Sequence, residues 1–290
     1  MNLRLRAPAK LNLGLRILGV RPDGFHDIRS VFQEISLADM ILLRTEAGCG
    51  RISLCCPGSC LPEDGGNLAW KAAESFLSAT GLGLDVSMEV HKRIPLYAGL
   101  GGGSSDAASV LTGLAEATGA DIDLAPLAES LGSDVPFFLK GGAALVEGRG
   151  ERLSPLPAIR FHAVLLHPRI RVSTPWAYAE WDLRSASLTG RGPVEHDSAL
   201  SAAWHEGKPF PHGLWNDFLP LLEERFPEIA ALARFLRGSC ESWGLSGSGP
   251  TLYALFRTEL QAERFSEELP GGIPFTMCRS AEAAGASSNW

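Results

Sequence analysis

A glycine-rich segment, Pro95 to Ser105, constrains the fold of this chain more than any other stretch. Four of the five residues from Gly99 to Gly103 are glycines, so the backbone there is able to adopt positive φ and to approach another group closely. The alternating residues 84–92 before it predict a strand, and the apolar spacing of residues 104–117 after it predicts a helix. We therefore expect a strand, a glycine loop and a helix in succession.

The start of a helix after such a loop is suited to binding an anion. Unpaired N–H groups and the helix dipole attract phosphate, while Ser104 and Ser105 offer a helix cap, hydroxyl donors and a candidate magnesium contact. The loop lacks the Gly-Lys-Ser/Thr ending of a P-loop, and Ser104 occupies the third glycine position of the dinucleotide fingerprint. Taken alone, the glycine run is explained equally well by a hinge or a tight backbone crossing.

Other segments carry reactive side chains, and each has a simpler explanation. Lys10 lies between apolar residues and would face a carboxylate or phosphate, although exposure on an edge strand is favoured when it is considered alone. Asp134 precedes an apolar stretch and would be a helix N-cap or a catalytic base. Phe25 and His26 follow a turn, where a ring would stack or simply be exposed. Considered alone, the small residues 245–249 favour a plain tight turn over a backbone that lies against the glycine loop or a substrate.

Composition excludes several classes of protein. The net charge is −7 with no basic stripe, which argues against nucleic acid as a partner and requires phosphate to be bound locally. No signal peptide is evident and no apolar run reaches the roughly 18 residues of a membrane span, so a cytoplasmic protein without a membrane partner is expected. Four of the six cysteines fall within residues 49–60 without recurring CxxC pairs, which favours free thiols over a zinc site.

The order of the predicted elements indicates an α+β fold, because strands and helices are mixed without strict alternation. Strands are predicted at residues 3–18, 27–43, 84–92, 161–167 and 251–256, and helices at residues 67–80, 104–117, 126–131, 174–181, 219–236 (broken near Pro227) and 260–268.

Three stretches have no such periodicity. Residues 48–66 predict a loop, residues 184–211 a loop or insertion, and the small polar tail from Ala281 favours disorder. Pro155 and Pro157 lie close together and favour a division into domains 1–155 and 156–290.

Three motifs in order give the chain a resemblance to the GHMP kinase superfamily. They are Pro8-x-Lys10-Leu11-Asn12, the loop from Pro95 through Gly99 to Ser105, and the late turn Ser246 to Gly249. Within the superfamily, the chain resembles the kinases that phosphorylate the 2-hydroxyl of a cytidyl diphosphate sugar alcohol in non-mevalonate isoprenoid synthesis. Further segments that carry this resemblance are residues 7–13, 21–26, 132–138, 147–151, 172–175 and 216–218. It covers roughly residues 3 to 256.

The resemblance implies a fold and a set of roles. The fold has an N-terminal ribosomal protein S5 domain 2-like domain and a C-terminal ferredoxin-like α/β sandwich. ATP is the implied co-substrate, together with Mg²⁺ whose ligands stay unassigned, and the acceptor is a small molecule. Asp134 would be the base with Lys10 as its partner; Phe25 and His26 would face the cytosine, and Asn12 and Thr174 the sugar alcohol. The implied ATP-binding residues are Pro95, Leu96, Tyr97, Ala98, Gly99, Leu100, Gly101, Gly102, Gly103, Ser104 and Ser105.

Two positions depart from the pattern of the superfamily branch, and alternatives stay open. Phe25 replaces a common tyrosine, which keeps stacking and loses a hydroxyl, and Tyr97 replaces a small residue, where it would narrow the nucleotide entrance or stack on adenine. Homoserine or mevalonate kinase activity is the alternative enzyme function, although residues 23–26 argue against it. A catalytically silent ligand-binding member is the alternative from another class. The sequence indicates no particular oligomeric state.

Overall fold

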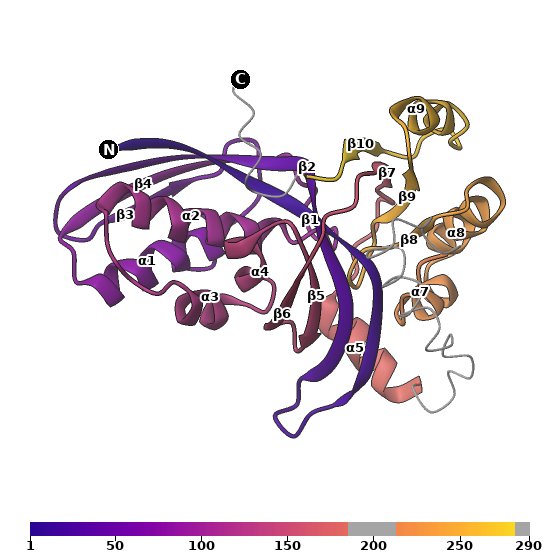
Figure 1. The fold of residues 1–290 in the computed structure, drawn as a ribbon, viewed down its shortest axis with the longest axis horizontal. Coiled ribbons are helices and arrows are strands. Elements are labelled where there is room, and N and C mark those ends of the chain that lie inside the picture. Colours follow the sequence, from indigo (N-terminus) through magenta and orange to yellow (C-terminus); the bar gives the residue numbers. More distant parts are fainter. Residues whose placement is uncertain (185–212, 282–290) are drawn as a thin grey trace. The chain divides into compact units, whose positions relative to one another are not determined.

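The computed structural model describes residues 1–184 and 213–281 (Figure 1). The predicted insertion at 184–211 and the tail after Ala281 therefore lie almost wholly outside the described residues. Contacts divide the chain into two compact units, each of which is described by itself. The first unit comprises residues 1–9, 37–95 and 101–141, and the second comprises residues 10–36, 96–100 and 142–290.

The first unit combines a sheet with four helices. Strand β4 (Leu84–His91) pairs parallel with β3 (Ile52–Cys55) and antiparallel with the second half of β2 (His26–Ala47). Strand β1 (Asn2–Val20) begins in this unit and pairs with β2. The helices are α1 (Leu68–Thr80), α2 (Gly102–Thr118), α3 (Ala125–Leu131) and α4 (Val135–Lys140).

The helices of the first unit bury their apolar faces in one core. Asn67 caps α1 by accepting the N–H of Ala69 at 3.0 Å, and the left-handed Gly81 ends the helix. Helices α1 and α2 pack on each other, and α1 also contacts β3. The core includes Phe76, Leu111 and Val135, and burial of such side chains is the main force that holds the unit together.

The second unit has two groups of strands. The first half of β2 pairs antiparallel with β5 (Ala143–Gly148), which pairs in turn with β6 (Arg152–Leu156). A four-stranded antiparallel sheet has the order β10 (Phe275–Arg279), β7 (His162–Leu166), β9 (Leu252–Phe256), β8 (Trp243–Leu245). The helices in the described residues of this unit are α5 (Thr174–Arg184), α7 (Leu219–Arg225), α8 (Pro227–Ser239) and α9 (Glu259–Glu267).

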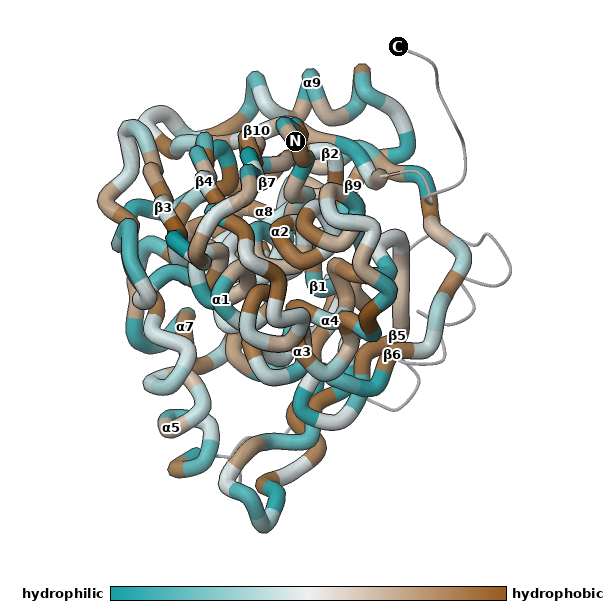
Figure 2. Tube along the Cα trace, turned by 90° about the vertical axis from the view of Figure 1, so that its left-hand side faces the viewer, coloured by the Kyte–Doolittle hydropathy of each residue, from teal (hydrophilic) through white to brown (hydrophobic). Residues whose placement is uncertain are grey.

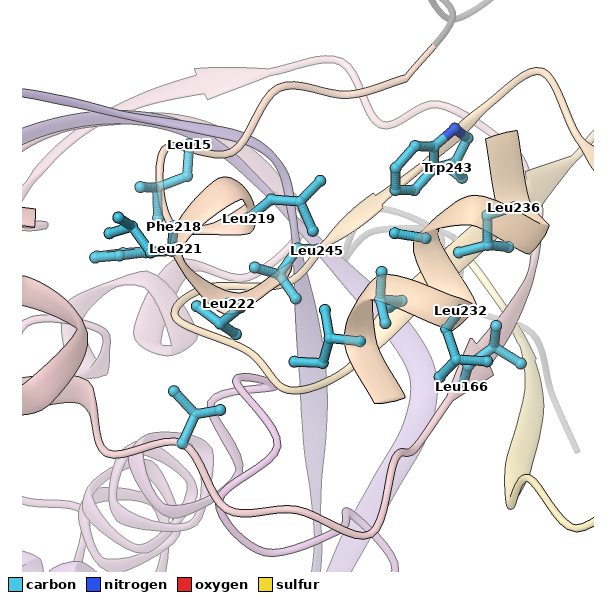
Figure 3. Close-up of a cluster of buried hydrophobic side chains, with 14 of the residues drawn as sticks. Leu15, Leu166, Phe218, Leu219, Leu221, Leu222, Leu232, Leu236, Trp243 and Leu245 are labelled. Atoms are coloured by element: carbon cyan, nitrogen blue, oxygen red, sulfur yellow. The ribbon is translucent and has the colours of Figure 1, made fainter. Parts of the chain in front are cut away.

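The core of the second unit joins residues that are far apart in the sequence. Leu15 from β1 belongs to the same buried cluster as Phe218, Leu245 and Trp243, as Figure 3 shows. Helix α9 is mostly hydrophilic in Figure 2 because it buries only one side against this cluster. Leu15, Ile17 and Ile28 from the segment 10–36 are therefore part of the core of the second unit.

The predicted α+β class is confirmed, and most predicted elements are present. Helices α7 and α8 are separate, with Pro227 opening the second, as the proline predicts. Strand β3 falls inside the stretch predicted to be a loop, and β10 was not predicted. Strand β6 occupies the proline-containing stretch near residue 155; it is an edge strand, where a missing N–H costs no ladder bond. None of the described helices is both long and apolar enough to cross a membrane.

Candidate active site

The glycine loop leads into an uncapped helix. Gly101 has φ 72° and is the N-cap of α2, and Ser105 donates its N–H to the Gly101 carbonyl at 2.9 Å. The helix therefore begins before Ser104 and Ser105, so the prediction that either serine caps it is wrong. No side chain caps α2 and its first turn carries no acidic residue. Because the first N–H groups of a helix have no intrahelical acceptor, this end is suited to a phosphate group.

The hydroxyl of Ser105 is an unusual feature of this first turn. Ser105 is fully buried, and its Oγ has no hydrogen-bond partner among the residues that the structure describes. Ser104 beside it is half-buried. Because buried polar atoms are normally paired, an orphan hydroxyl at this position is a candidate ligand contact. No three His, Cys, Asp or Glu side chains in the described ranges gather as metal ligands.

Within the second unit, residues 96–100 of the glycine loop lie directly against the late small-residue turn. The Ser246 hydroxyl donates to the Gly99 carbonyl at 2.9 Å. Gly99 has φ 74°, and a Cβ built on it would lie 2.2 Å from the Ser246 carbonyl oxygen and 3.0 Å from that of Gly249. Only glycine fits this position, so the second of the two interpretations of residues 245–249 is the correct one.

Lys10 is buried, and the prediction from the residue alone, an exposed lysine on an edge strand, is wrong. Its residue exposure is 3%, and its ammonium group donates to the side-chain oxygen of Asn12 and lies 4.2 Å from the centre of the Phe32 ring. Its N–H donates to the Leu100 carbonyl at 3.0 Å. The strand thus brings Lys10 to the end of the glycine loop, where a buried cation needs anionic or polar partners.

Asn12 is the centre of a buried hydrogen-bond network on β1. It shares a strand face with Lys10, because side chains two residues apart point the same way. Its Nδ2 donates to the Ser30 hydroxyl at 3.0 Å, and its N–H donates to the Ser246 hydroxyl at 3.3 Å. Tyr253 donates its hydroxyl to the Asn12 carbonyl at 2.7 Å. The network holds Lys10, the glycine loop and the late turn in one arrangement within the second unit.

Thr174 and the late turn are also joined. The hydroxyls of Thr174 and Ser248 lie 2.8 Å apart, and Thr174 is exposed at the start of α5. Asn216 donates from Nδ2 to the carbonyls of Leu245 at 2.8 Å and Gly247 at 2.9 Å. Asn216 therefore fixes the backbone of the turn, and Thr174 presents a hydroxyl beside it.

His26 is held in a pocket of aromatic rings. It is 9% exposed, its Nε2 lies 2.7 Å from Asp182 Oδ1, and its ring centre lies 4.5 Å from that of Tyr178 and 5.7 Å from that of Trp181. The expectation of an exposed histidine after a turn is therefore wrong. Phe25 beside it is 50% exposed, and the Arg149 guanidinium lies 5.2 Å from its ring centre.

The remaining loop residues differ in exposure. Leu100 and Ala98 are buried, whereas Tyr97 is 58% exposed and has the unusual φ of 56° for a residue with a side chain. The Arg171 guanidinium lies 5.0 Å from the Tyr97 ring centre. Leu96 is half-buried in the second unit, and Pro95 is half-buried in the first.

Asp134 belongs to the first unit, at the N-cap position of α4. Its side chain makes no capping hydrogen bond, although the N-cap is the usual role of an aspartate there. It is half-buried. Lys10 belongs to the second unit, so the pairing of Lys10 with Asp134 stays a prediction.

Several residues around the site were not singled out from the sequence. Ser30, Tyr178, Asp182 and Tyr253 have no local motif, because their contacts reach residues far away in the chain. Lys92 and Asp106 flank the glycine loop, and Lys92 forms ion pairs with Asp106 and with buried Asp39. A lysine directly after a strand and an aspartate directly after two helix serines are signals that could have drawn attention to this cluster.

Comparison with known proteins identifies the family. The family model for the GHMP kinases N terminal domain matches residues 67–142, and that for the GHMP kinases C terminal matches residues 211–272. These matches lie on either side of residue 155, and a domain boundary at that residue stays a prediction. A crystal structure of homoserine kinase from Cytophaga hutchinsonii is 18% identical with a TM-score of 0.68 over 97% of this chain and 95% of its own, and shows the shared fold.

Relatives at higher identity extend over nearly the whole chain. The 4-diphosphocytidyl-2-C-methyl-D-erythritol kinase of Gloeobacter violaceus is 39% identical, covering 97% of this chain and 95% of its own length. That of Deinococcus radiodurans is also 39% identical, covering 92% and 89%. A crystal structure of 4-(cytidine 5'-diphospho)-2C-methyl-D-erythritol kinase is 35% identical with a TM-score of 0.81, covering 96% and 99%. The chain therefore belongs to the GHMP kinases, in the family of 4-diphosphocytidyl-2-C-methyl-D-erythritol kinases.

Proposed function

We propose that this protein transfers the γ-phosphoryl group of ATP to the 2-hydroxyl of 4-diphosphocytidyl-2-C-methyl-D-erythritol, giving the 2-phosphate and ADP in non-mevalonate isoprenoid synthesis. Membership of the kinase family over nearly the whole chain supports the reaction. The structural observation that carries the proposal is the glycine loop, which packs by Gly99 on the late turn and ends at the uncapped helix α2. This end of α2 supplies N–H groups to the phosphates of ATP.

The proposed chemistry needs a base and a cation. Phosphoryl transfer depends mainly on alignment and on neutralisation of charge, and the acceptor hydroxyl is a poor nucleophile. Asp134 takes the hydroxyl proton as the bond to phosphorus forms. Lys10 is the proposed partner of Asp134 and offsets charge on the transferring group. Its burial beside Asn12 holds the ammonium in one place.

The residues proposed to recognise the acceptor substrate all belong to the second unit. His26, oriented by Asp182 and packed on Tyr178, is proposed to hydrogen-bond the cytosine, and exposed Phe25 to stack on it. Asn12 and Thr174 contact the sugar-alcohol end. Mg²⁺ accompanies ATP in this proposal, and the orphan Ser105 hydroxyl is an oxygen donor at the start of α2. A cytoplasmic location is part of the proposal, since a reducing compartment suits the free thiols of all six cysteines.

A turnover assay tests the reaction and the base together. The purified protein is given ATP with the cytidyl substrate, mevalonate or homoserine in parallel, and only the cytidyl substrate is expected to yield ADP. Asp134→Asn is expected to keep ATP binding and lose at least ~100-fold in kcat, the low end for a positioned base. The exposed carboxylate of Asp123, which accepts the Ala125 N–H at 3.0 Å, gives the matched control Asp123→Asn with wild-type turnover.

The outcomes separate the alternatives. Turnover of mevalonate or homoserine in place of the cytidyl substrate would assign the protein to another GHMP kinase activity. Binding of ATP and the cytidyl substrate without turnover would identify a silent member of the fold. Near-normal kcat in Asp134→Asn would remove Asp134 from the mechanism while leaving the reaction intact.

A further inference from the structure

A buried ion cluster in the first unit is not used by the chemistry described so far. Lys92 Nζ donates to Asp39 Oδ2 and to Asp106 Oδ2, the latter at 2.6 Å. The three side chains are almost completely buried, at 9% exposure for Lys92, 0% for Asp39 and 3% for Asp106. Lys92 directly follows β4, and Asp106 lies in the second turn of α2. The cluster therefore joins the strand before the glycine loop to the helix after it.

Asp39 holds the entrance of the loop. Its Oδ1 accepts the N–H of Arg93 at 2.5 Å and the N–H of Ile94 at 2.9 Å. These are the two residues directly before Pro95. A carboxylate that accepts two successive backbone N–H groups fixes the direction in which the chain leaves the strand.

Lys92 holds the exit of the loop. Its Nζ lies 3.4 Å from the position that a Cβ would occupy on Gly102, the first residue of α2, and Ile94 Cγ2 lies 3.1 Å from the same position. Its ion pair with Asp106 fixes the helix one turn further on. The same three side chains thus connect the residues on both ends of the loop.

Stability is a poor explanation for this arrangement. Removing three charged groups from water is costly, and buried ion pairs commonly stabilise a fold no better than apolar side chains of similar size. What the cluster supplies is directional bonding, since each donor and acceptor has a fixed geometry. Because the cluster lies between β4 and α2, these hydrogen bonds and ion pairs fix the positions of the two ends of the glycine loop.

The charge of the cluster is compatible with a phosphate site at the start of α2. Burial raises the pKa of Asp106 to about 7, although the attraction of Lys92 acts to lower it. Asp106 Oδ1 has no hydrogen-bond partner in the described part of the chain. With Asp106 protonated, the cluster holds one ammonium and one carboxylate and has no net charge, so it does not repel a polyanion bound above it.

We propose that Asp39 and Lys92 are positioning residues for ATP, which hold the two ends of the glycine loop at the spacing that the triphosphate requires. The inference rests on the proposed binding of ATP by this loop. It goes beyond the assigned roles, because neither side chain belongs to the loop or to the proposed catalytic pair. Removing either link loosens the loop without removing any group that contacts ATP.

The test is a change in ATP recognition that a loss of stability alone would not produce. In Asp39→Asn, the amide keeps the shape of the side chain but turns an N–H₂ group or a neutral oxygen toward the Lys92 ammonium. We expect KM for ATP to rise by about tenfold to a hundredfold, the range for misplacement by a remote substitution. KM for the cytidyl acceptor is expected to stay at the wild-type value. Equilibrium binding of a non-hydrolysable ATP analogue measures the same loss without turnover.

Asp85 offers a matched control at the opposite end of β4. Its Oδ1 accepts the N–H groups of Cys49 at 2.9 Å and Arg51 at 3.0 Å, and its Oδ2 pairs with the Arg51 guanidinium at 2.7 Å. Like Asp39, it accepts two backbone N–H groups and pairs with one cation, although this cation is exposed and the contacts lie away from the glycine loop. Asp85→Asn is expected to lower the denaturation midpoint in the same direction as Asp39→Asn and to leave KM for ATP unchanged.

A second variant guards against misfolding of the first. Lys92→Met combined with Asp39→Asn and Asp106→Leu replaces all three charged side chains by uncharged ones, a change that buried ion clusters tolerate because no charge is left without a partner. The amide oxygen at residue 39 still offers an acceptor to the two backbone N–H groups. The triple variant is expected to fold and to bind the ATP analogue about tenfold or more weakly. Wild-type affinity for the analogue in this triple variant, or equal effects of Asp39→Asn and Asp85→Asn on KM for ATP, would overturn the inference. Failure of the wild type to phosphorylate the cytidyl substrate while binding the analogue would instead count against the proposed function.

Discussion

Asp106 shows how burial sets the chemistry of one residue. Asp106 lies in the second turn of α2 and is 2% exposed. Lys92 is its ion-pair partner, and Lys92 also pairs with a second carboxylate, that of Asp39. Burial alone would lower the pKa of Lys92, but Asp106 and Asp39 raise it above its ordinary range, so Lys92 stays charged. The ionised form of Asp106 is disfavoured mainly by desolvation, which outweighs its attraction to Lys92. The folded state therefore holds a proton that the unfolded chain releases.

This proton predicts a pH dependence of stability. The pKa of Asp106 is about 7 when folded and 3.8 in its ordinary range, so the native state binds more protons between these values and its stability falls as pH rises. The amide of an Asn side chain does not titrate, so Asp106→Asn removes this contribution to the pH dependence. The unfolding free energy of the wild type minus that of Asp106→Asn is expected to fall by about 2 kcal/mol between about pH 5 and about pH 6.5. Urea denaturation at the two pH values measures the difference.

Neighbouring groups do not obscure this comparison. Burial raises the pKa of the Cys56 thiol above its ordinary value, so it stays protonated throughout the window. Lys92 stays charged for the reason given above. Groups outside the cluster are the same in both proteins, so their contributions cancel in the difference. A difference that does not change with pH would show that Asp106 is already ionised in the folded protein.

In the glycine loop, a local property and a distant contact both require glycine at residue 99. Gly99 has a left-handed backbone and no space for a Cβ, because the turn at Ser246 lies against it. The first property follows from the run of glycines. The second depends on a turn almost 150 residues away, and the sequence does not show that the two meet.

Gly99→Ala separates these two properties when it is compared with Gly58→Ala. Gly58 has nearly the same φ, 71° against 74°, but no atom lies within 4 Å of its Cβ position. Both variants pay the backbone cost of a left-handed alanine, roughly 1–2 kcal/mol, and only Gly99→Ala collides with the Ser246 carbonyl. Gly99→Ala is expected to lower kcat/KM for ATP by about a hundredfold, while Gly58→Ala keeps the wild-type value. Equal kinetics in the two variants would mean that the contact with the turn does not position the loop.

The two compact units of the molecule are not continuous in the sequence. Residues 10–36 belong to the unit that also contains residues 142–290. Leu15 donates its N–H to the Trp215 carbonyl at 2.7 Å, and the Ile17 N–H is accepted by Asp217 Oδ2 at 2.6 Å. Both side chains lie in the hydrophobic core of this unit. The C-terminal half therefore depends on β1 and the start of β2.

This dependence predicts that residues 156–290 do not fold alone. A fragment without Leu15, Ile17 and Ile28 loses three core side chains, each worth roughly 2–5 kcal/mol, against a typical stability of roughly 5–15 kcal/mol. We expect circular dichroism of the fragment to show no cooperative urea transition. Mixing it with the fragment 1–155 is expected to restore a transition, since the missing strands are then supplied. Cooperative unfolding of residues 156–290 by themselves would contradict the argument.

Local patterns in the sequence determined much of the fold and the family. Asn67 and Gly81 bound α1, Pro227 separates α7 from α8, and the glycine run predicts the loop before α2. Each of these depends on φ preferences or on caps within a few residues, so the information is local. The motifs around Lys10, the loop and the late turn sufficed to indicate a GHMP kinase, which the relatives confirm.

Only the tertiary structure decided which polar residues are buried and what they contact. Nothing near Lys10 or His26 in the sequence shows that Phe32 lies beside Lys10 or Asp182 beside His26. Considered without the family resemblance, both residues were therefore expected to be exposed. The ion cluster at Asp39 joins residues more than 50 positions apart. Burial, desolvation and pairing are properties of the assembled chain, because they depend on which distant segments exclude water from a given atom.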